Sequence, residues 1–449
     1  MGQETDGDRS GRLSVPSTLR TAANVLLPTV AQGVIARRPS VVGLFDRLDA
    51  DRRAVRQMQQ LAEEYGPGPV QLNVPGRSFA VVLDPDHVHQ ILEQSPEPFA
   101  TANLEKRAAL KHFQPRGVLI SHGRQRAERR RFNEAVLDTG RPVHGMADQI
   151  VATVRDEAEQ LAAQASGSGH LAWDDFIVAW WRVVRRVVLG DSARDDHETT
   201  DLLSRLRGEA NWSYLLPRRF SVYDRFKGRL RGHLERAEPG SLAALIAETP
   251  QDADTDPADQ VPQWLFAFDP AGMAAIRALA LLTTHPMAGR EVREEVDGVD
   301  LSTPQELRRT RAAVLESVRL WPTTPAILRD STTETTWPTG TLPAGTGFLI
   351  YAPYFHRDDR RLDYADRFAP EVWHEGGHGD WPLIPFSEGP GVCPGQDLVL
   401  LTTSTFLACL LRSHEFRLLG PDRLDPGSPL PATLSPFDVR FAVTDRGRS

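Results

Sequence analysis

The amino-acid sequence predicts a mainly α-helical protein with small β-sheets. Long stretches carry apolar side chains at helical spacing, around residues 170–190, 263–282 and 396–411. A shorter stretch, residues 71–83, alternates apolar and polar side chains around Pro75-Gly76, which is typical of a β-hairpin. With 40% hydrophobic residues in a chain of 449, a large core can be buried.

The amino-terminal region precedes this core. We expect residues 1–15 to form a disordered polar tail and residues 16–449 to form a single domain. Residues 25–36 are apolar, but they fall far short of the roughly 20 residues that a membrane span needs, and they contain Pro28 and Gly33. We therefore expect neither a membrane span nor a signal peptide.

Two further helical regions occupy the middle of the chain. Residues 202–242 hold several aromatic side chains around Pro217, which predicts two helices joined by a loop. Residues 263–282 indicate a long buried helix that ends near His285-Pro286. Upstream of both, residues 123–132 are rich in arginine and predict a helix with a basic face.

The most informative segment is the loop of residues 386–395, Phe-Ser-Glu-Gly-Pro-Gly-Val-Cys-Pro-Gly. Glycines let the backbone curl close to the sulfur of Cys393, and a helix that begins near Gln396 directs its positive dipole end toward it. Both effects favour the thiolate, which is the form of cysteine that binds a metal. The second cysteine, Cys409, lies in an apolar helical run, where buried packing is the expected role.

This loop resembles the cysteine-ligand loop of the cytochrome P-450 family, in which Phe, Gly, Cys and Gly occupy fixed positions. Phe386, Gly389, Cys393 and Gly395 fill all four. Further landmarks of the family precede the loop in the family's order, namely Glu316-x-x-Arg319, residues 323–329, residues 342–346, residues 356–358 and residues 366–370. The resemblance implies a cytochrome P-450 fold, a triangular α-rich prism around a buried haem.

By this resemblance the cofactor is haem b, with Cys393 as the iron ligand and Phe386 and Gly395 shaping the loop around it. Arg126, Arg130 and Arg329 are the expected partners of the haem propionates. The family usually has Arg or His two residues before the cysteine, and this chain has Gly391 instead.

The resemblance also assigns a structural role to three charged residues. Glu316, Arg319 and Arg367 are expected to form a buried charge triad beneath the haem. Removing one member of such a group leaves the others buried without a partner, at a cost of several kcal/mol.

The helix of residues 263–282 resembles the family's central helix over the distal haem face. Counting back from His285-Pro286 places the catalytic stretch at Ala267, Asp269 and Pro270, with Asp269-Pro270 where the family has an acid and a threonine. An alternative register puts the Ala-Gly signature on residues 271–272 and alanines at the pair. We prefer the first register because it keeps the spacing to the helix end and retains an acid. Neither register supplies the threonine.

The missing hydroxyl leaves several mechanisms open, because an alcohol and an acid usually relay the protons that oxygen activation requires. The first expectation is a monooxygenase that inserts one oxygen atom from O2 into a hydrophobic small molecule. Alternatives are a peroxide-driven peroxygenase and a non-oxygenating haem-thiolate enzyme. A haem-binding sensor without turnover is a more remote alternative.

Partners and location follow from the same resemblance. A monooxygenase needs an electron donor, and we expect ferredoxin and ferredoxin reductase, docking through Arg124, Arg129 and Arg131. The net charge of −8 argues against nucleic-acid binding. Two cysteines make a disulfide framework implausible and suit a cytoplasmic protein, and the preference for Arg over Lys fits a bacterial source.

Overall fold

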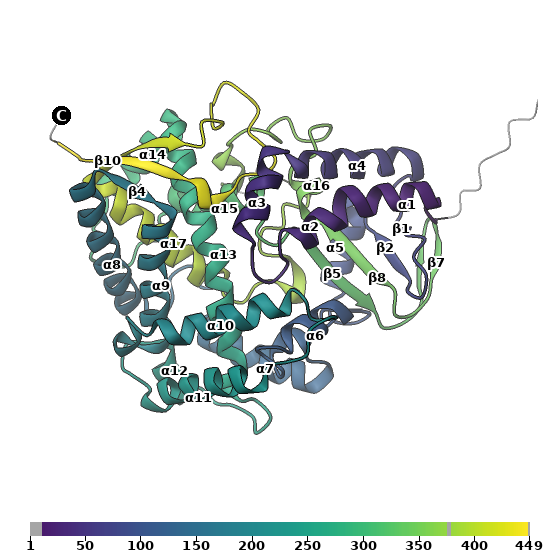
Figure 1. Ribbon diagram of the computed structural model, residues 1–449, viewed down its shortest axis with the longest axis horizontal. Coiled ribbons are helices and arrows are strands. Elements are labelled where there is room, and N and C mark those ends of the chain that lie inside the picture. Colours follow the sequence, from purple (N-terminus) through teal and green to yellow (C-terminus); the bar gives the residue numbers. More distant parts are fainter. Residues whose placement is uncertain (1–10, 375–378, 448–449) are drawn as a thin grey trace, which may run out of the picture.

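The computed structural model describes residues 11–374 and 379–447, and it is mainly helical with small sheets, as the sequence predicts (Figure 1). A π-helical turn, Ala22–Leu26, joins the first two helices. The α-helices are α1 Val15–Thr21, α2 Leu27–Ala31, α3 Pro39–Arg47, α4 Ala50–Tyr65, α5 Pro85–Glu93, α6 Leu104–Leu110, α7 Gly123–Leu137, α8 Ala147–Ser168, α9 Trp173–Leu189, α10 His197–Ala210, α11 Phe220–Arg236, α12 Leu242–Glu248, α13 Pro257–Thr284, α14 Pro286–Asp297, α15 Arg308–Leu320, α16 Ala352–His356 and α17 Gln396–Ser413.

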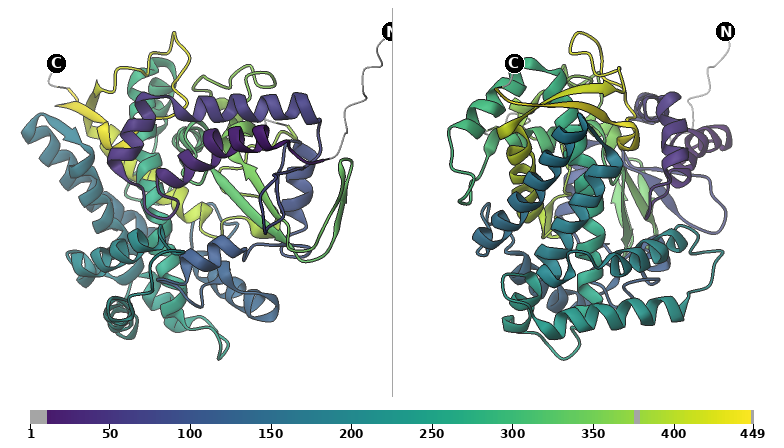
Figure 2. Two further views of the ribbon diagram at one scale, coloured as in Figure 1. Left: turned by 45° about the vertical axis from the view of Figure 1, so that its right-hand side comes forward. Right: turned by 60° about the vertical axis from the view of Figure 1, so that its left-hand side comes forward.

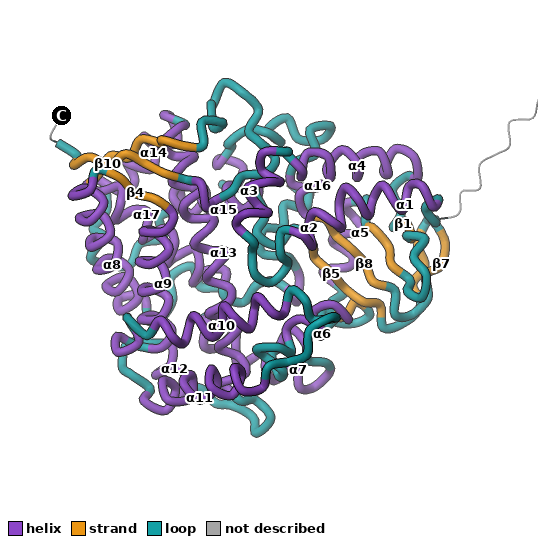
Figure 3. Tube along the Cα trace, in the orientation of Figure 1, coloured by secondary structure: helices purple, strands orange, loops and turns teal. Residues whose placement is uncertain are grey.

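The strands form three sheets, with orders β1-β2-β8-β5-β3, β4-β10-β9 and β6-β7. The largest sheet lies on one side of the molecule and most helices lie on the other (Figure 3). The strands are β1 Val70–Gln71, β2 Phe79–Val81, β3 Phe99–Ala100, β4 His170–Ala172, β5 Ala326–Ser331, β6 Thr335–Trp337, β7 Gly340–Leu342, β8 Gly347–Tyr351, β9 His414–Gly420 and β10 Arg440–Asp445.

The predicted hairpin is present as β1 and β2, which pair antiparallel with Val70 opposite Val81. Strand β2 then runs parallel to β8, and β8 pairs antiparallel with β5. Side chains of α4, including Met58 and Leu61, share a hydrophobic cluster with the buried residues of this sheet. The sheet and the helices packed on it therefore share a core of their own, separate from the main helical core.

Helix α13 runs through the middle of the helical half, and the views in Figure 2 show the other helices arranged around it. It is longer than predicted, because it begins at Pro257 and not at residue 263. Asp256 caps this end by accepting a hydrogen bond from Ala258 N. Pro262 and Pro270 both lie inside it. Of the residues described, only this helix is long and apolar enough to cross a membrane, and 78% of its most apolar window is buried inside the protein.

The start of the described chain differs from the expected disordered tail. Residues 1–10 lie outside the described part, but Arg12 forms a parallel bridge with Gln71, and Leu13 N donates to the Gln71 carbonyl at 2.8 Å. Leu13 is 2% exposed. Because residues 11–13 pair with the sheet edge, Leu13 is buried and Val15 begins α1, the tail prediction is wrong for residues 11–15.

Candidate functional site

The loop that carries Cys393 is held by tight backbone contacts. Cys393 N donates to the Phe386 carbonyl at 2.9 Å, which folds the loop back on itself. Gly389 has a φ of +62°, and a Cβ there would lie 2.5 Å from the Leu92 carbonyl oxygen of α5. Only glycine fits this close approach. Cys393 is a free cysteine that, as a whole residue, is partly exposed.

The protonation of Cys393 differs from the sequence expectation. Burial raises the pKa of the thiol, while a hydrogen bond from the Gly395 amide and the charge of Arg130 act in the opposite direction. The amide and the N-terminus of α17 are placed as predicted, but desolvation outweighs them. The apolar setting therefore favours the thiol until a cation, such as a bound metal, stabilises the thiolate.

Helix α7 brings two of the predicted arginines to this loop. Arg130 Nη1 donates to the Val392 carbonyl at 2.7 Å, directly before the cysteine. Arg126 is 9% exposed and donates to the Thr101 hydroxyl at 3.1 Å and to the Pro390 carbonyl at 3.4 Å. Both arginines therefore lie at the edge of the cysteine loop.

Arg329 reaches the same loop from β5, and its position explains Gly391. The Arg329 guanidinium donates to the Ser95 hydroxyl at 3.0 Å and to the Ser387 hydroxyl at 3.4 Å. A Cβ on residue 391 would lie 2.9 Å from Arg329 Nη2. A larger side chain, such as the Arg or His usual in the family, would collide with this guanidinium. Arg329 thus occupies the space that such a side chain would need.

A fourth cation, Lys106, was missed by the sequence analysis. Its ammonium group donates to the carbonyls of Thr101 and Leu328 at 3.1 and 3.0 Å. The sequence carries no signal that Lys106 belongs to the site, because it lies in the first turn of a helix with an ordinary N-cap, Asn103. Its contact with the Leu328 carbonyl exists only because β5 lies beside α6.

These cations lack negative partners. Among the described residues, Arg126, Arg329 and Lys106 form no ion pair with a carboxylate; each bonds to neutral oxygens. Burial, and then the charge of Arg126, lowers the pKa of Arg329 to about 10; burial, and then the charge of Arg329, lowers the pKa of Lys106 well below its usual range. Buried positive charge of this kind fits a dianionic ligand beside the cysteine, as the two carboxylates of haem would be.

Glu316 and Arg319 form the buried pair that the sequence predicts. Both side chains are fully buried on α15, and two Arg319 nitrogens contact the two Glu316 oxygens at 2.6 and 2.7 Å. Glu316 also accepts hydrogen bonds from Ala369 N and Trp373 Nε1, each at 2.9 Å. The carboxylate therefore has a complete set of donors.

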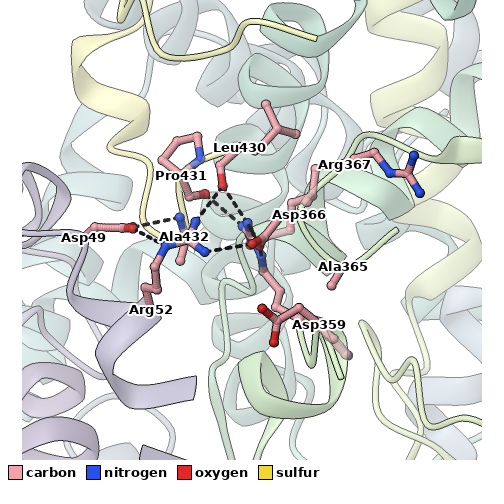
Figure 4. Close-up of polar contacts among 12 residues, drawn as sticks. Asp49, Arg52, Asp359, Ala365, Asp366, Arg367, Leu430, Pro431 and Ala432 are labelled. Carbon is pink, nitrogen blue, oxygen red and sulfur yellow. Dashed lines mark hydrogen bonds and ion pairs between the residues drawn. The ribbon is translucent and has the colours of Figure 1, made fainter. Parts of the chain in front are cut away.

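The third member of the predicted triad is wrong. Arg319 Nη2 donates to the backbone carbonyl of Arg367 at 2.8 Å, while the Arg367 side chain is 63% exposed and points away (Figure 4). Its guanidinium instead donates to the Asp363 carbonyl at 2.6 Å. A backbone oxygen completes the coordination of Arg319, so no second buried cation is needed there.

The neighbouring residue, Asp366, is the one that faces inward (Figure 4). It accepts hydrogen bonds from Arg52 at 2.7 Å and from the nearly buried Arg357 at 3.0 Å. Arg357 also donates to the carbonyls of Leu430 and Pro431, each at 2.8 Å. This network ties α4 and the segment after α16 to the chain near residue 430. Residues 356–358 and 366–370 served only as landmarks in the sequence, which carries no signal for this pairing.

On α13, the predicted catalytic stretch lies where the helix is partly open. Ala267, Asp269 and Pro270 are partly exposed, whereas residues 271–282 are buried. Asp269 pairs with Arg207 of α10 at 2.6 Å, and Arg207 also donates to the Ile35 carbonyl at 3.0 Å. The predicted acid is thus held in an ion pair that the sequence did not indicate.

The helix continues through Pro270 despite the missing amide. Pro270 has no hydrogen to donate to the carbonyl of Phe266, one turn earlier. Nearby, Trp180 Nε1 of α9 donates to the Phe268 carbonyl at 2.7 Å, and Gly272 leaves room for that indole, since a Cβ would lie 2.7 Å from its ring. Packing against α9 therefore supports the helix where its own hydrogen bonding is weakened.

One predicted docking residue is not available to a partner. Arg129 is 4% exposed and donates to the Ser121 hydroxyl at 2.5 Å and to the Asp254 carbonyl at 3.1 Å. Arg124 and Arg131 have side-chain exposures of 88% and 71%. The difference in exposure arises because Arg129 lies on the face of α7 that contacts the loop before α13, whereas Arg124 and Arg131 lie on exposed faces.

Relatives with known names share segments of this chain. The chain is 30% identical over 183 residues to the probable cytochrome P450 4d20 of Drosophila melanogaster, a match that covers 38% of this chain and 36% of that protein. It is also 30% identical over 171 residues to 2-hydroxyisoflavanone synthase of Glycine max, covering 34% of this chain and 33% of that protein. The matched segments thus span about a third of these relatives.

Solved structures share the whole fold. The cytochrome P450DA haem domain superposes with a TM-score of 0.71 at 16% identity, covering 88% of this chain and 93% of that one. A zebrafish cytochrome P450 crystallised with abiraterone has a TM-score of 0.65 at 19% identity, covering 87% and 98%. These likenesses confirm the predicted cytochrome P-450 fold.

A family model described as Cytochrome P450 matches residues 37–238 and 269–434, which is most of the chain and includes α7, α15 and the cysteine loop. The family binds haem, and the unpaired cations around the cysteine loop fit that cofactor. By sequence, by fold and by the residues gathered around Cys393, the chain belongs to the cytochrome P450 family.

Proposed function

We propose that this protein is a haem-thiolate monooxygenase that contains haem b and inserts an oxygen atom into a hydrophobic small molecule. The observation that carries the proposal is the set of buried cations without carboxylate partners beside Cys393. Such a set is costly in a protein that binds no anion, because isolated buried charge is strongly unfavourable.

The proposed roles follow from placement. Cys393 supplies the thiolate ligand of the iron, and Gly395 donates its amide to the sulfur. Arg126, Arg329 and Lys106 hold the propionates, with Arg130 fixed beside them by the Val392 carbonyl. When bound, haem supplies the activation of O2 or of peroxide.

The distal side of the site determines how protons arrive. Asp269 is held by Arg207 at 2.6 Å, so its carboxylate is oriented rather than free to rotate. Pro270 has no hydroxyl to share. We propose that ordered water, positioned by the Asp269 carboxylate, carries protons in place of the family's alcohol.

The same observations favour a second candidate, a peroxide-driven peroxygenase. Peroxide already contains the protons and electrons that O2 must acquire, so a site without the alcohol suits it. The two candidates differ in whether an electron donor is required.

For the monooxygenase we propose a separate ferredoxin with its reductase as electron donor. Support comes from the exposed side chains of Arg124 and Arg131 on α7, the helix that also contacts the cysteine loop. A cytoplasmic location is likewise a proposal; it is supported by two cysteines that are both free.

The first experiment compares haem binding in matched cysteine variants. Cys393→Ser should lose the thiolate signature in the absorption spectrum of the reduced carbon monoxide complex, whereas Cys409→Ser should keep it because that thiol packs inside α17. An unchanged spectrum in Cys393→Ser would refute the assignment of the ligand.

The second experiment separates the two oxidants. Purified protein is incubated with fatty acids, terpenes, steroids and aromatics, either with peroxide alone or with ferredoxin, reductase, reduced nicotinamide and O2. Product that requires the electron chain supports the monooxygenase. Product that is as abundant with peroxide supports the peroxygenase, and no product with any substrate class would contradict both.

A further inference from the structure

A small cavity of about 40 Å³ lies beside α13, and its lining includes three charged side chains. Arg37 comes from the loop between α2 and α3, Asp51 from the start of α4 and Arg277 from α13. Met273, one turn before Arg277, and Thr433, from the chain after β9, also line it. Charged groups from three parts of the chain thus meet in one cavity.

Arg277 is buried without a carboxylate partner among the described residues. It is 8% exposed, and its guanidinium donates to the Trp321 carbonyl at 3.3 Å and to the Leu434 carbonyl. Its Nε has no hydrogen-bond partner in the described part of the chain. Burial lowers the pKa of Arg277 to about 9, which is the response of a cation whose charge is poorly compensated.

Arg37 adds a second cation to the cavity. Its Nη2 donates to the Thr323 carbonyl at 2.7 Å, and burial lowers its pKa, with Asp51 as the largest opposing charge. Asp51 bonds to the Thr433 hydroxyl at 2.9 Å and to the Tyr351 hydroxyl at 3.3 Å. One carboxylate therefore faces two guanidinium groups.

Among the described residues, Asp46 and Asp269 are the other carboxylates whose charge acts on these two arginines, and both are already paired. Asp46 contacts Arg423, and Asp269 pairs with Arg207 at 2.6 Å. The cavity therefore holds an excess of one positive charge, with an unpartnered nitrogen on one of its two arginines.

We propose that this cavity binds the carboxylate of the substrate, through Arg277 and Arg37. A guanidinium presents parallel donors that match the two oxygens of a carboxylate, and a volume of about 40 Å³ admits a group of that size but not a whole substrate. Met273, which lies between Arg277 and Pro270 on α13, lines the same cavity, so the rest of the molecule would extend along this helix. At 1.5 Å per residue, Arg277 lies about 10 Å along the helix from Pro270.

This inference rests on the proposed function, because it names the class of substrate as a hydrophobic acid. It predicts that oxidation occurs on a part of the molecule remote from the carboxylate, which is held about two turns of α13 away from the Asp269-Pro270 stretch.

The test measures binding by calorimetry with the haem-loaded protein. The ligands are dodecanoate, abietate and cinnamate, each compared with its matching primary alcohol. The wild type should bind at least one acid about tenfold or more tightly than its alcohol, as expected for a charge-assisted contact that contributes about 1.4 kcal/mol or more. Arg277→Gln should abolish that preference by weakening the binding of the acid more than that of the alcohol.

Two variants control for folding and for general loss of charge. Arg37→Gln changes a residue outside the helices, and it too should weaken the preference for acids. It replaces Arg277→Gln as the test variant if Arg277→Gln does not fold. Arg311→Gln removes a buried arginine of α15 that, like Arg277, donates to a backbone carbonyl and has an unpartnered Nε within the described chain, but lies outside the cavity lining. It should keep the preference for acids.

Equal binding of acids and alcohols by the wild type would overturn the inference, as would a preference that survives both Arg277→Gln and Arg37→Gln. Turnover is scored separately with both oxidants. Acids that bind through Arg277 without being oxidised would refute the proposed function and leave the anion site standing. Neutral compounds that are bound and oxidised, with acids excluded, would refute the anion site and leave the function standing.

Discussion

At the scale of single residues, the fully buried pair of Glu316 and Arg319 has no solvent to compensate for a lost partner. Glu316→Gln should therefore lower the free energy of unfolding by about 3–5 kcal/mol, because it leaves Arg319 charged and buried. Arg367→Ala should change it by less than about 0.5 kcal/mol, because that side chain is 63% exposed. Urea unfolding of both variants measures the difference. A comparable loss of unfolding free energy in Arg367→Ala would show that Arg367 does belong to the buried charge group.

The residue scale also shows where sequence reasoning stops. Motif spacing located Cys393, Arg126, Arg130 and Arg329, and the structure brings all four to one loop. It could not distinguish Asp366 from Arg367, because adjacent residues point in opposite directions and the one that faces inward depends on the local turn. Lys106 and Arg207 were missed for a related reason: Leu328 is 222 residues from Lys106 in sequence, and Asp269 is 62 residues from Arg207.

At the scale of elements, the contact between α9 and α13 depends on one glycine. A Cβ on Gly272 would lie 2.7 Å from Trp180 Cδ1 and 2.9 Å from its Nε1, so the indole cannot remain where it donates to the Phe268 carbonyl. Gly272→Ala should destabilise the protein by about 1–3 kcal/mol through overpacking.

Thermal unfolding of a pair of variants tests this contact. In the background Trp180→Phe, which lacks the indole nitrogen and has a smaller ring, Gly272→Ala should cost less than it does in the wild type. Equal costs in both backgrounds would show that the strain arises elsewhere. The spacing of apolar residues predicted both helices. It could not predict the contact of Trp180 with Gly272, because the sequence does not show which face of α13 meets α9.

A second element contact, between α5 and the cysteine loop, should depend on pH. His89 Nδ1 lies 2.9 Å from the Glu388 carboxylate, and its Nε2 lies 2.8 Å from the Asp380 carbonyl. Burial acts to lower the pKa of His89, but these hydrogen bonds and the charge of Glu388 raise it above its usual value of 6.5. The protonated form is therefore the one that the folded state favours.

The sign of the effect follows from that shift. A raised pKa contributes stability that is fully present below about pH 6.5 and is lost as the pH rises through the folded value. The difference in thermal midpoint between wild type and His89→Gln should be largest near pH 5.5 to 6 and should shrink toward about pH 8.5. A difference that grows with pH would contradict the assignment.

At the scale of the whole molecule, the cations around the cysteine loop link cofactor binding to folding. Without an anion, Arg126, Arg329 and Lys106 repel one another in a region of low dielectric. A ligand that binds only the folded state stabilises it by mass action, so haem loading should raise the thermal midpoint. Calorimetric scans of the apo and haem-loaded protein measure that rise.

The size of the rise should depend on Lys106. Lys106→Met removes one repulsive charge from the apo protein and one partner from the loaded protein, so the gap between their midpoints should narrow. Lys111→Met, on an exposed neighbour, should leave the gap unchanged. The overall fold could be predicted because its landmarks are local in sequence. The coupling between haem binding and folding could not, because it depends on charges that α6, α7 and β5 bring together.

The ion pair between Arg207 and Asp269 also has a kinetic consequence. One guanidinium joins α10, α13 and the carbonyl of Ile35 near the amino terminus. Outward movement of α10 must separate the two charges while protein still shields them from water, which raises the barrier to opening. Ligands whose entry or release requires this movement should therefore exchange slowly in both directions, so that their residence time depends on this ion pair and not on affinity alone.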